Sequence, residues 1–132
     1  MKKIVSILFI TFLSFTSNLL AEDSKSIKRI SEGEENAKIT IIAYESLTCG
    51  HCADFHKNVY PDLKKNFIEK GLVKIEFRHF PLDIAAFNAS KVGQCRNDGK
   101  SDLMHTLCTG QKKWAKGNTP EQANDYLKKF LK

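Results

Sequence analysis

Two cysteines separated by two residues are the part of this chain most able to do chemistry. Cys49 and Cys52 enclose Gly50-His51 in a C-x-x-C motif. Two thiols at this spacing can close a small disulfide ring or bind a metal ion. Which of these occurs depends on the pKa of each thiol, on the redox compartment and on the other ligands that the chain supplies.

A strand followed by a helix is expected to position the two thiols. Residues 38–44 are rich in β-branched residues and almost continuously apolar, which predicts a strand buried on both faces. After the motif, apolar residues recur every three or four positions, which predicts a helix. Thr48 is a candidate N-cap, which would place Cys49 in the first helical turn. The expected buried stripe of this helix comprises Cys52, Phe55, Val59, Leu63 and Phe67.

The start of the helix would make the two thiols chemically unequal. Unpaired backbone N–H groups and the helix dipole stabilise a thiolate at Cys49. His51 can add a positive charge or a hydrogen-bond donor to the same sulfur. Cys52 lies about one turn further along the helix and should be partly buried. We therefore expect Cys49 to be the attacking thiol and Cys52 the resolving thiol, with His51 tuning the pair.

Two other uses of the motif stay open, namely half of a zinc site and an inert disulfide. A zinc site needs a second pair of ligands, and Cys95 and Cys108 are separated by twelve residues, an unpromising ligand spacing. An inert disulfide across so short a ring would constrain the unfolded chain little. Redox chemistry is the favoured hypothesis, and we expect neither a metal nor a cofactor.

Cys95 and Cys108 can also pair with each other. They lie in two predicted helical segments joined by a tight turn at Asp98-Gly99, so their side chains could meet. An oxidising compartment favours a disulfide. The alternative is a pair of buried free thiols, because cysteine is among the most buried residue types. We expect a structural disulfide here.

Residues 1–21 have the layout of a secretory signal peptide. A basic start is followed by an apolar run from Ile4 to Phe15, and Ala21 stands directly before charged residues. The alternative is a membrane anchor, for which the apolar run is short. The net charge of +6 falls to +4 without Lys2 and Lys3 and is spread along the chain, so nucleic-acid binding is not expected.

The order of the elements predicts an α/β fold. A polar arm over residues 22–37, with a turn near Gly33, would precede the strand and the helix. Residues 72–79 alternate apolar and charged side chains, which predicts a second strand. The order strand–helix–strand implies that the two strands are parallel. Residues 84–132 predict helices alone, with N-caps at Asp83, Ser101 and Thr119.

Two motifs resemble those of the DsbA-like, thioredoxin-fold disulfide oxidoreductases of bacteria. They are residues 44–56, which include the C-x-x-C motif, and Phe77-Arg78-His79-Phe80-Pro81-Leu82-Asp83. The resemblance implies a thioredoxin-like β-α-β unit over residues 38–83 and a helical insertion over residues 84–132. It also implies a periplasmic enzyme that exchanges disulfides with exported proteins and is re-oxidised by a membrane partner.

The chain departs from that family in two ways. Gly50-His51 stands where DsbA-like proteins usually have Pro-His, and it resembles the dipeptide of protein disulfide isomerases, which implies a less oxidising couple. The chain also resembles only the first two-thirds of the family's fold, without its cis-proline loop, its last two strands and its final helix. None of its prolines, Pro61, Pro81 and Pro120, matches that cis-proline. A fragment without function of its own is therefore the second hypothesis.

Overall fold

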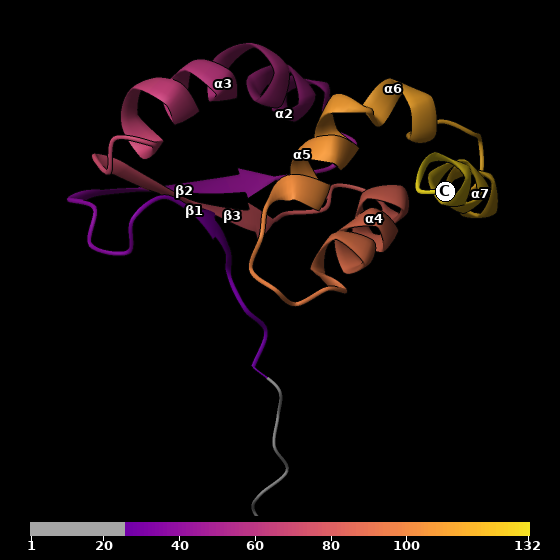
Figure 1. Cartoon of the computed structure of the whole chain (residues 1–132). Coiled ribbons are helices and arrows are strands. Elements are labelled where there is room, and N and C mark those ends of the chain that lie inside the picture. The colour runs from indigo at the N-terminus through magenta and orange to yellow at the C-terminus, as the bar shows by residue number, and fades with distance from the viewer. Residues whose placement is uncertain (1–25) are drawn as a thin grey trace, which may run out of the picture.

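A three-stranded mixed sheet carries the thiol motif at one of its ends (Figure 1). The computed structural model describes residues 26–132, so the predicted signal peptide over residues 1–21 lies outside the described residues. The strands are β1 (Ile30–Glu32), β2 (Ile39–Glu45) and β3 (Val73–His79), in the order β1-β3-β2. Strands β2 and β3 are parallel, as the strand–helix–strand order predicted, and β1 pairs with β3 in the antiparallel sense.

Strand β1 lies inside the segment that the sequence predicted to be a polar arm. Ile30 is buried and pairs with Phe77 of β3. A strand of three residues is too short to show an alternating pattern, which is why the sequence did not reveal it. The turn predicted near Gly33 is confirmed, because this glycine has a φ of +102° and a Cβ there would lie 2.6 Å from the carbonyl oxygen of Val73.

Strand β2 is covered on only one face. Ile41 and Ala43 pack against the core, whereas Ile42 and Tyr44 on the opposite face are exposed. The prediction of a strand buried on both faces is therefore wrong. The apolar run is genuine, but β2 is an edge strand of the described sheet, and no element of residues 26–132 covers Ile42 and Tyr44.

The helix after the motif alternates between α-helical and π-helical turns. It consists of α2 (Gly50–Asp54), η1 (Phe55–Val59), α3 (Tyr60–Leu63) and η2 (Lys64–Ile68). A π turn contains more residues than an α turn. Because this helix alternates the two kinds of turn, residues four apart stay on one face. The buried residues are accordingly His56, Tyr60 and Ile68. The predicted stripe is wrong at Val59 and Phe67, which are exposed.

Only helices follow β3, as the sequence predicted. They are α4 (Ile84–Gln94), α5 (Asp102–Thr109), α6 (Gln111–Trp114) and α7 (Pro120–Phe130). The short α6 adds a fourth helix to the three whose N-caps were predicted. Two predicted N-caps are confirmed, since Asp83 accepts a hydrogen bond from the Ala86 N–H at 2.7 Å and Thr119 accepts one from the Gln122 N–H at 3.3 Å. The hydroxyl of Ser101 does not cap α5 and instead donates to Glu32.

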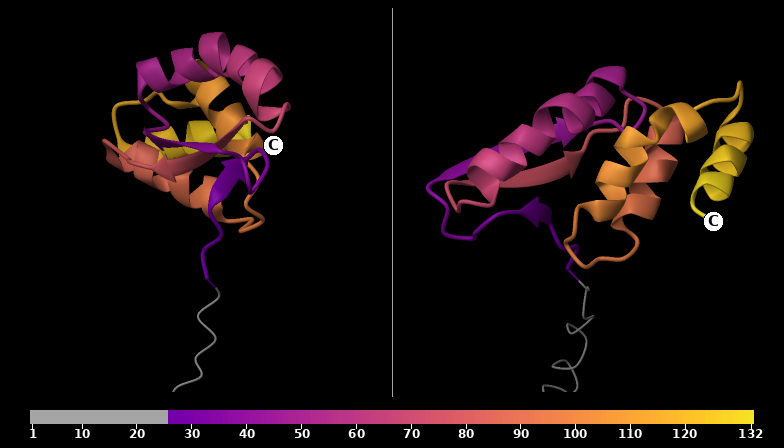
Figure 2. Two further views of the ribbon diagram at one scale, coloured as in Figure 1. Left: turned by 90° about the vertical axis from the view of Figure 1, so that its left-hand side faces the viewer. Right: turned by 45° about the horizontal axis from the view of Figure 1, so that its top comes forward.

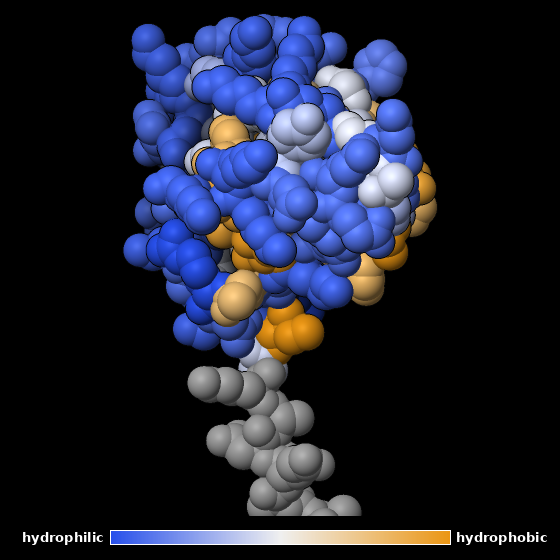
Figure 3. All heavy atoms as spheres, turned by 90° about the vertical axis from the view of Figure 1, so that its right-hand side faces the viewer, coloured by the Kyte–Doolittle hydropathy of each residue, from blue (hydrophilic) through white to orange (hydrophobic). Residues whose placement is uncertain are grey.

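The helices and the sheet share one hydrophobic core. Helix α5 lies beside α2 and η1, while α7 packs on α4 and α6 at the end of the molecule away from β1 (Figure 2). The largest fully buried side chain is Trp114, whose indole N–H donates to the carbonyl of Leu107 at 2.8 Å. Hydrophilic residues cover most of the face shown in Figure 3. Within residues 26–132, none of the helices is long and apolar enough to cross a bilayer.

Candidate functional site

The thiol motif begins where the chain leaves β2 and enters α2. Cys49 is the N-cap residue of α2, with an extended backbone (φ −78°, ψ 122°), and its carbonyl accepts the N–H of Ala53 at 3.1 Å. The prediction that Thr48 would be the N-cap is therefore wrong by one residue. The hydroxyl of Thr48 donates instead to Asp83 at 2.6 Å. This hydrogen bond joins the loop that carries Cys49 to the segment that follows β3.

Two further groups hold the loop that carries Cys49. The Cys49 N–H donates to the carbonyl of Ser46 at 3.0 Å. The side-chain amide of Gln111, the first residue of α6, donates to the carbonyls of Leu47 and Cys49 at 2.9 Å each. Leu47 is fully buried in the core. The position of Cys49 is thus fixed both by local turns and by a distant helix.

The environment of Cys49 favours its thiolate. The backbone N–H of Cys52 is the main group that lowers the pKa of the Cys49 thiol, and the Cys52 thiol and the backbone N–H of His51 add to this effect. Partial burial and the negative charge of Glu45 oppose it without reversing it. The ring of His51 is exposed, so this residue acts on the sulfur through its backbone.

The environment of Cys52 favours the neutral thiol. Burial is the main cause that raises the pKa of Cys52, and the negative charges of Cys49 and Glu45 act in the same direction. A backbone hydrogen bond from Ser46 reduces this shift. The opposite pKa shifts of the two thiols mean that Cys49 loses its proton before Cys52 does.

A chain of hydrogen bonds runs through the interior behind the thiols. Glu45 Oε2 lies 2.6 Å from His56 Nε2, and His56 Nδ1 lies 2.6 Å from His105 Nδ1. His105 Nε2 lies 2.8 Å from Glu32 Oε1 on β1. The π-helical turn η1 directs His56 into the core, where it is 3% exposed.

Glu32 is the carboxylate at the end of this chain of hydrogen bonds. Burial by itself would raise the pKa of Glu32, but hydrogen bonds from four side chains together lower it far below its ordinary value. These side chains are His105, Ser101, Tyr60 and Lys64. A largely buried negative charge is therefore held by donors from α3, η2 and α5 and from Ser101 directly before α5.

The disulfide expected between Cys95 and Cys108 is not formed in the structure. All four cysteines are free thiols, with Cys95 exposed and Cys108 buried. Cys95 follows α4 and lines a groove together with Leu127 of α7 and Leu131, the residue after this helix. Cys108 faces the core beside Glu45, and burial followed by that negative charge raises the pKa of its thiol well above the ordinary value. The two side chains point in different directions, which the tight turn between their helices did not reveal.

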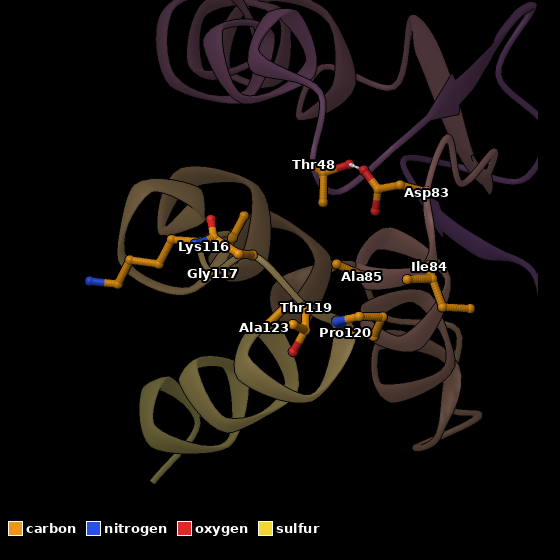
Figure 4. Close-up of a pocket in the computed structure, with 11 residues that line it drawn as sticks. Thr48, Asp83, Ile84, Ala85, Lys116, Gly117, Thr119, Pro120 and Ala123 are labelled. Atoms are coloured by element: carbon orange, nitrogen blue, oxygen red, sulfur yellow. Dashed lines mark hydrogen bonds between the residues drawn. The ribbon is translucent and has the colours of Figure 1, made fainter.

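A cleft of about 410 Å³ lies next to the loop that carries Cys49 (Figure 4). The hydrogen-bonded pair Thr48 and Asp83 forms one wall. Residues 115–120, between α6 and α7, form the opposite wall. The residue directly before Cys49 therefore borders an open groove with polar and apolar lining.

Comparison with known proteins defines the family. A family profile described as thioredoxin matches residues 25–131. The structure of alpha-DsbA1 from Wolbachia pipientis superposes with a TM-score of 0.67 and 30% identity, over 78% of this chain and 51% of that chain. The chain belongs to the DsbA-like, thioredoxin-fold family of disulfide oxidoreductases. The predicted α/β thioredoxin-like fold is thereby confirmed.

Other relatives of this DsbA-like chain agree. A Rickettsia conorii protein named "Putative protein-disulfide oxidoreductase" is 30% identical over 88 residues, which are 65% of this chain and 32% of that protein. BdbD of Bacillus subtilis shares the fold, with a TM-score of 0.53 and 21% identity over 78% of this chain. The DsbA-like chain thus spans about a third of the length of the first of these relatives.

Several residues around the thiols were missed by sequence reasoning. Glu45 gave a usable signal, because it ends an apolar strand in phase with Ile41 and Ala43, and that phase places its carboxylate on the inner face. His105 and Gln111 gave no local signal, because their partners are 49 and 62 or more residues away in the chain. Only the packing of α5 and α6 against the sheet brings them to the site.

Proposed function

We propose that this chain is a thiol–disulfide oxidoreductase that exchanges disulfides with exported proteins through Cys49 and Cys52. The observation that carries the proposal is the opposite shift of the two thiol pKa values at the start of α2. A lowered pKa gives Cys49 a larger thiolate fraction than an ordinary thiol has, and a raised pKa favours the protonated form of Cys52.

The oxidising direction takes two exchange steps. A substrate thiolate attacks the Cys49 sulfur of the Cys49–Cys52 disulfide, the S–S bond breaks, and Cys52 leaves as a thiolate that takes up a proton. A second substrate thiolate then attacks the substrate sulfur of the mixed disulfide and releases the Cys49 thiolate. The substrate loses two electrons and the two cysteines gain them. The low pKa of Cys49 makes it a good leaving group in the second step.

The reducing direction runs through the same intermediate. The Cys49 thiolate attacks one sulfur of a substrate disulfide, the substrate S–S bond breaks, and the other substrate sulfur leaves as a thiolate while the mixed disulfide forms. Cys52 loses its proton, attacks the Cys49 sulfur and releases the reduced substrate. In both directions Cys49 is the sulfur that meets the substrate, and Cys52 is the resolving thiol. The exposed ring of His51 is available to contact the substrate, and the groove beside Thr48 accommodates the adjoining polypeptide.

We also propose that the protein is exported to the periplasm and that a membrane protein restores its redox state. The support for export is the basic start, apolar run and terminal Ala21 of residues 1–21. Fusion of residues 1–30 to a reporter enzyme that is active only after export tests this part. A fusion protein that accumulates in the cells without any reporter activity would contradict it.

Three single variants test the exchange chemistry. The purified chain should reduce a peptide disulfide faster than a simple dithiol does at equal concentration. C49S should abolish this activity, and C52S should accumulate a mixed disulfide between Cys49 and the peptide, detected by mass spectrometry. C95S is the matched control, because this exposed thiol lies away from the motif, and it should retain full activity.

The second hypothesis, a fragment without activity, gives different results in the same assays. It predicts exchange no faster than that of the simple dithiol and non-cooperative unfolding in urea. A cooperative unfolding transition together with loss of exchange in C49S supports the oxidoreductase. Exchange that survives in C49S would overturn the assignment of this cysteine.

A further inference from the structure

A second group of potential metal ligands lies in the core behind the thiol pair. Glu45, His56 and Cys108 come from β2, η1 and α5, and all three are buried. One ligand atom of each, a carboxylate oxygen, a ring nitrogen and a sulfur, lies within 4.8 Å of the others. Neither the exchange steps proposed above nor the hydrogen bonds from Glu45 to Glu32 make use of the Cys108 sulfur.

The hydrogen-bonded residues around His56 would orient it as a ligand. Metal-binding histidines usually donate their second ring N–H to a further acceptor, which fixes the tautomer and the ring orientation. His56 Nδ1 faces His105 Nδ1 at 2.6 Å, and His105 Nε2 in turn faces the carboxylate of Glu32 at 2.8 Å. Each of the two rings can therefore donate toward Glu32, so the lone pair of His56 Nε2 becomes available to an ion once the proton between this nitrogen and Glu45 leaves.

We propose that Glu45, His56 and Cys108 bind a divalent ion of the zinc class. One thiolate, one imidazole and one carboxylate form a borderline donor set of the kind that zinc and cobalt(II) accept. Bond lengths of about 2.0–2.3 Å place the ligands of a tetrahedral ion roughly 3.3–3.8 Å apart. Shifts of about 1 Å bring the three atoms to that spacing, and Glu45 and His56 must separate from their present 2.6 Å.

The ion would replace protons that the cluster now holds. Cys108 gives up its S–H proton and binds as a thiolate, and the proton shared between Glu45 and His56 leaves as well. The two negative charges on Cys108 and Glu45 then balance the two positive charges of the ion. Three protein ligands leave one tetrahedral position for water. This site differs from the zinc site that was considered for the C-x-x-C motif, because its ligands lie on β2, η1 and α5 and none of them is a cysteine of that motif.

Cobalt(II) titration of a variant without the redox thiols tests the site. In reduced C49S/C52S, cobalt should bind one ion per chain and show both a sulfur-to-cobalt charge-transfer absorption and the visible bands of a tetrahedral ion. Adding C108S should remove the charge-transfer absorption and weaken binding at least tenfold. Adding E45Q should weaken binding while the sulfur absorption remains at saturating cobalt. Because the redox thiols are absent, the outcome does not depend on the proposed oxidoreductase activity.

The chain offers a matched control for the cysteine. Adding C95S to the same background removes one free thiol at an exposed position, and it should leave cobalt binding unchanged. Circular dichroism of the metal-free variants verifies that each is folded. If the variant with C108S does not fold, the variant with E45Q still tests whether this cluster binds cobalt. The proposal would be overturned if C49S/C52S showed no charge-transfer absorption, or if that absorption remained after C108S was added to this background. In that case the cluster is a hydrogen-bonded core alone.

Discussion

Gly110 lies directly against the edge of the Phe130 ring. A Cβ at residue 110 would be 2.2 Å from Cζ of Phe130 and 2.9 Å from the carbonyl oxygen of Thr106. Gly110 joins α5 to α6, and Phe130 is the last residue of α7. The absence of a side chain at this one position lets α7 pack closely against the helices that border the thiol loop.

Substitution G110A should therefore destabilise the fold. The added methyl group must displace both an aromatic ring and a backbone carbonyl, and such overpacking costs about 1–3 kcal/mol. Urea unfolding followed by the fluorescence of Trp114 measures the loss. The matched control is G50A, because a Cβ at Gly50 meets nothing within 4 Å and alanine gains up to about 1 kcal/mol over glycine in a helix. Equal stability of G110A and the parent chain would contradict the packing described.

Cys49 should react as a thiolate at lower pH than a simple thiol. The backbone N–H groups at the start of α2 lower the pKa of Cys49, so its thiolate persists as the pH falls below about 8.5, the ordinary value for cysteine. Alkylation rates of the reduced chain, with the modified residue located by mass spectrometry, should give a midpoint below that of N-acetylcysteine. A midpoint equal to or above that of the small thiol would be inconsistent with the observed environment.

The carboxylate of Glu32 should make the fold sensitive to acid. The pKa of Glu32 is lowered in the folded chain, so its contribution to stability is complete above the unfolded value of about 4.3 and is lost as the pH falls below it. E32Q should be less stable than the parent at pH 7, and the difference should narrow below about pH 4. Urea unfolding midpoints of the parent chain and of E32Q between about pH 3 and about pH 7 measure this difference. The exposed Glu69 provides the control variant E69Q, which should follow the parent chain.

Removing the amide of Gln111 should loosen the loop that carries Cys49. Gln111 donates to the carbonyls of Leu47 and Cys49, and each lost hydrogen bond costs about 1 kcal/mol. Q111A should lower stability by about 1–2 kcal/mol and slow disulfide exchange. Q94A is the comparison, since the amide of Gln94 donates to Lys28 at an exposed position far from the thiols. If Q111A and Q94A behave alike, Gln111 does not position Cys49.

The sequence by itself determined the thiol motif, the parallel strand pair and the all-helical character of the chain after β3. Local signals sufficed there, because apolar periodicity and capping residues such as Asp83 and Thr119 act within a few positions of the chain. The same signals misplaced Val59 and Phe67, since an unperturbed 3.6-residue period does not anticipate π-helical turns.

Only the tertiary structure decided what surrounds the two thiols. The partners of Glu45, His56 and Gln111 come from distant segments, and no local pattern encodes the packing of α5 and α6 against the sheet. The same packing turned Cys108 into the core and away from Cys95. Spacing along the chain predicts which residues share an element, whereas burial, charge and pKa depend on which elements meet.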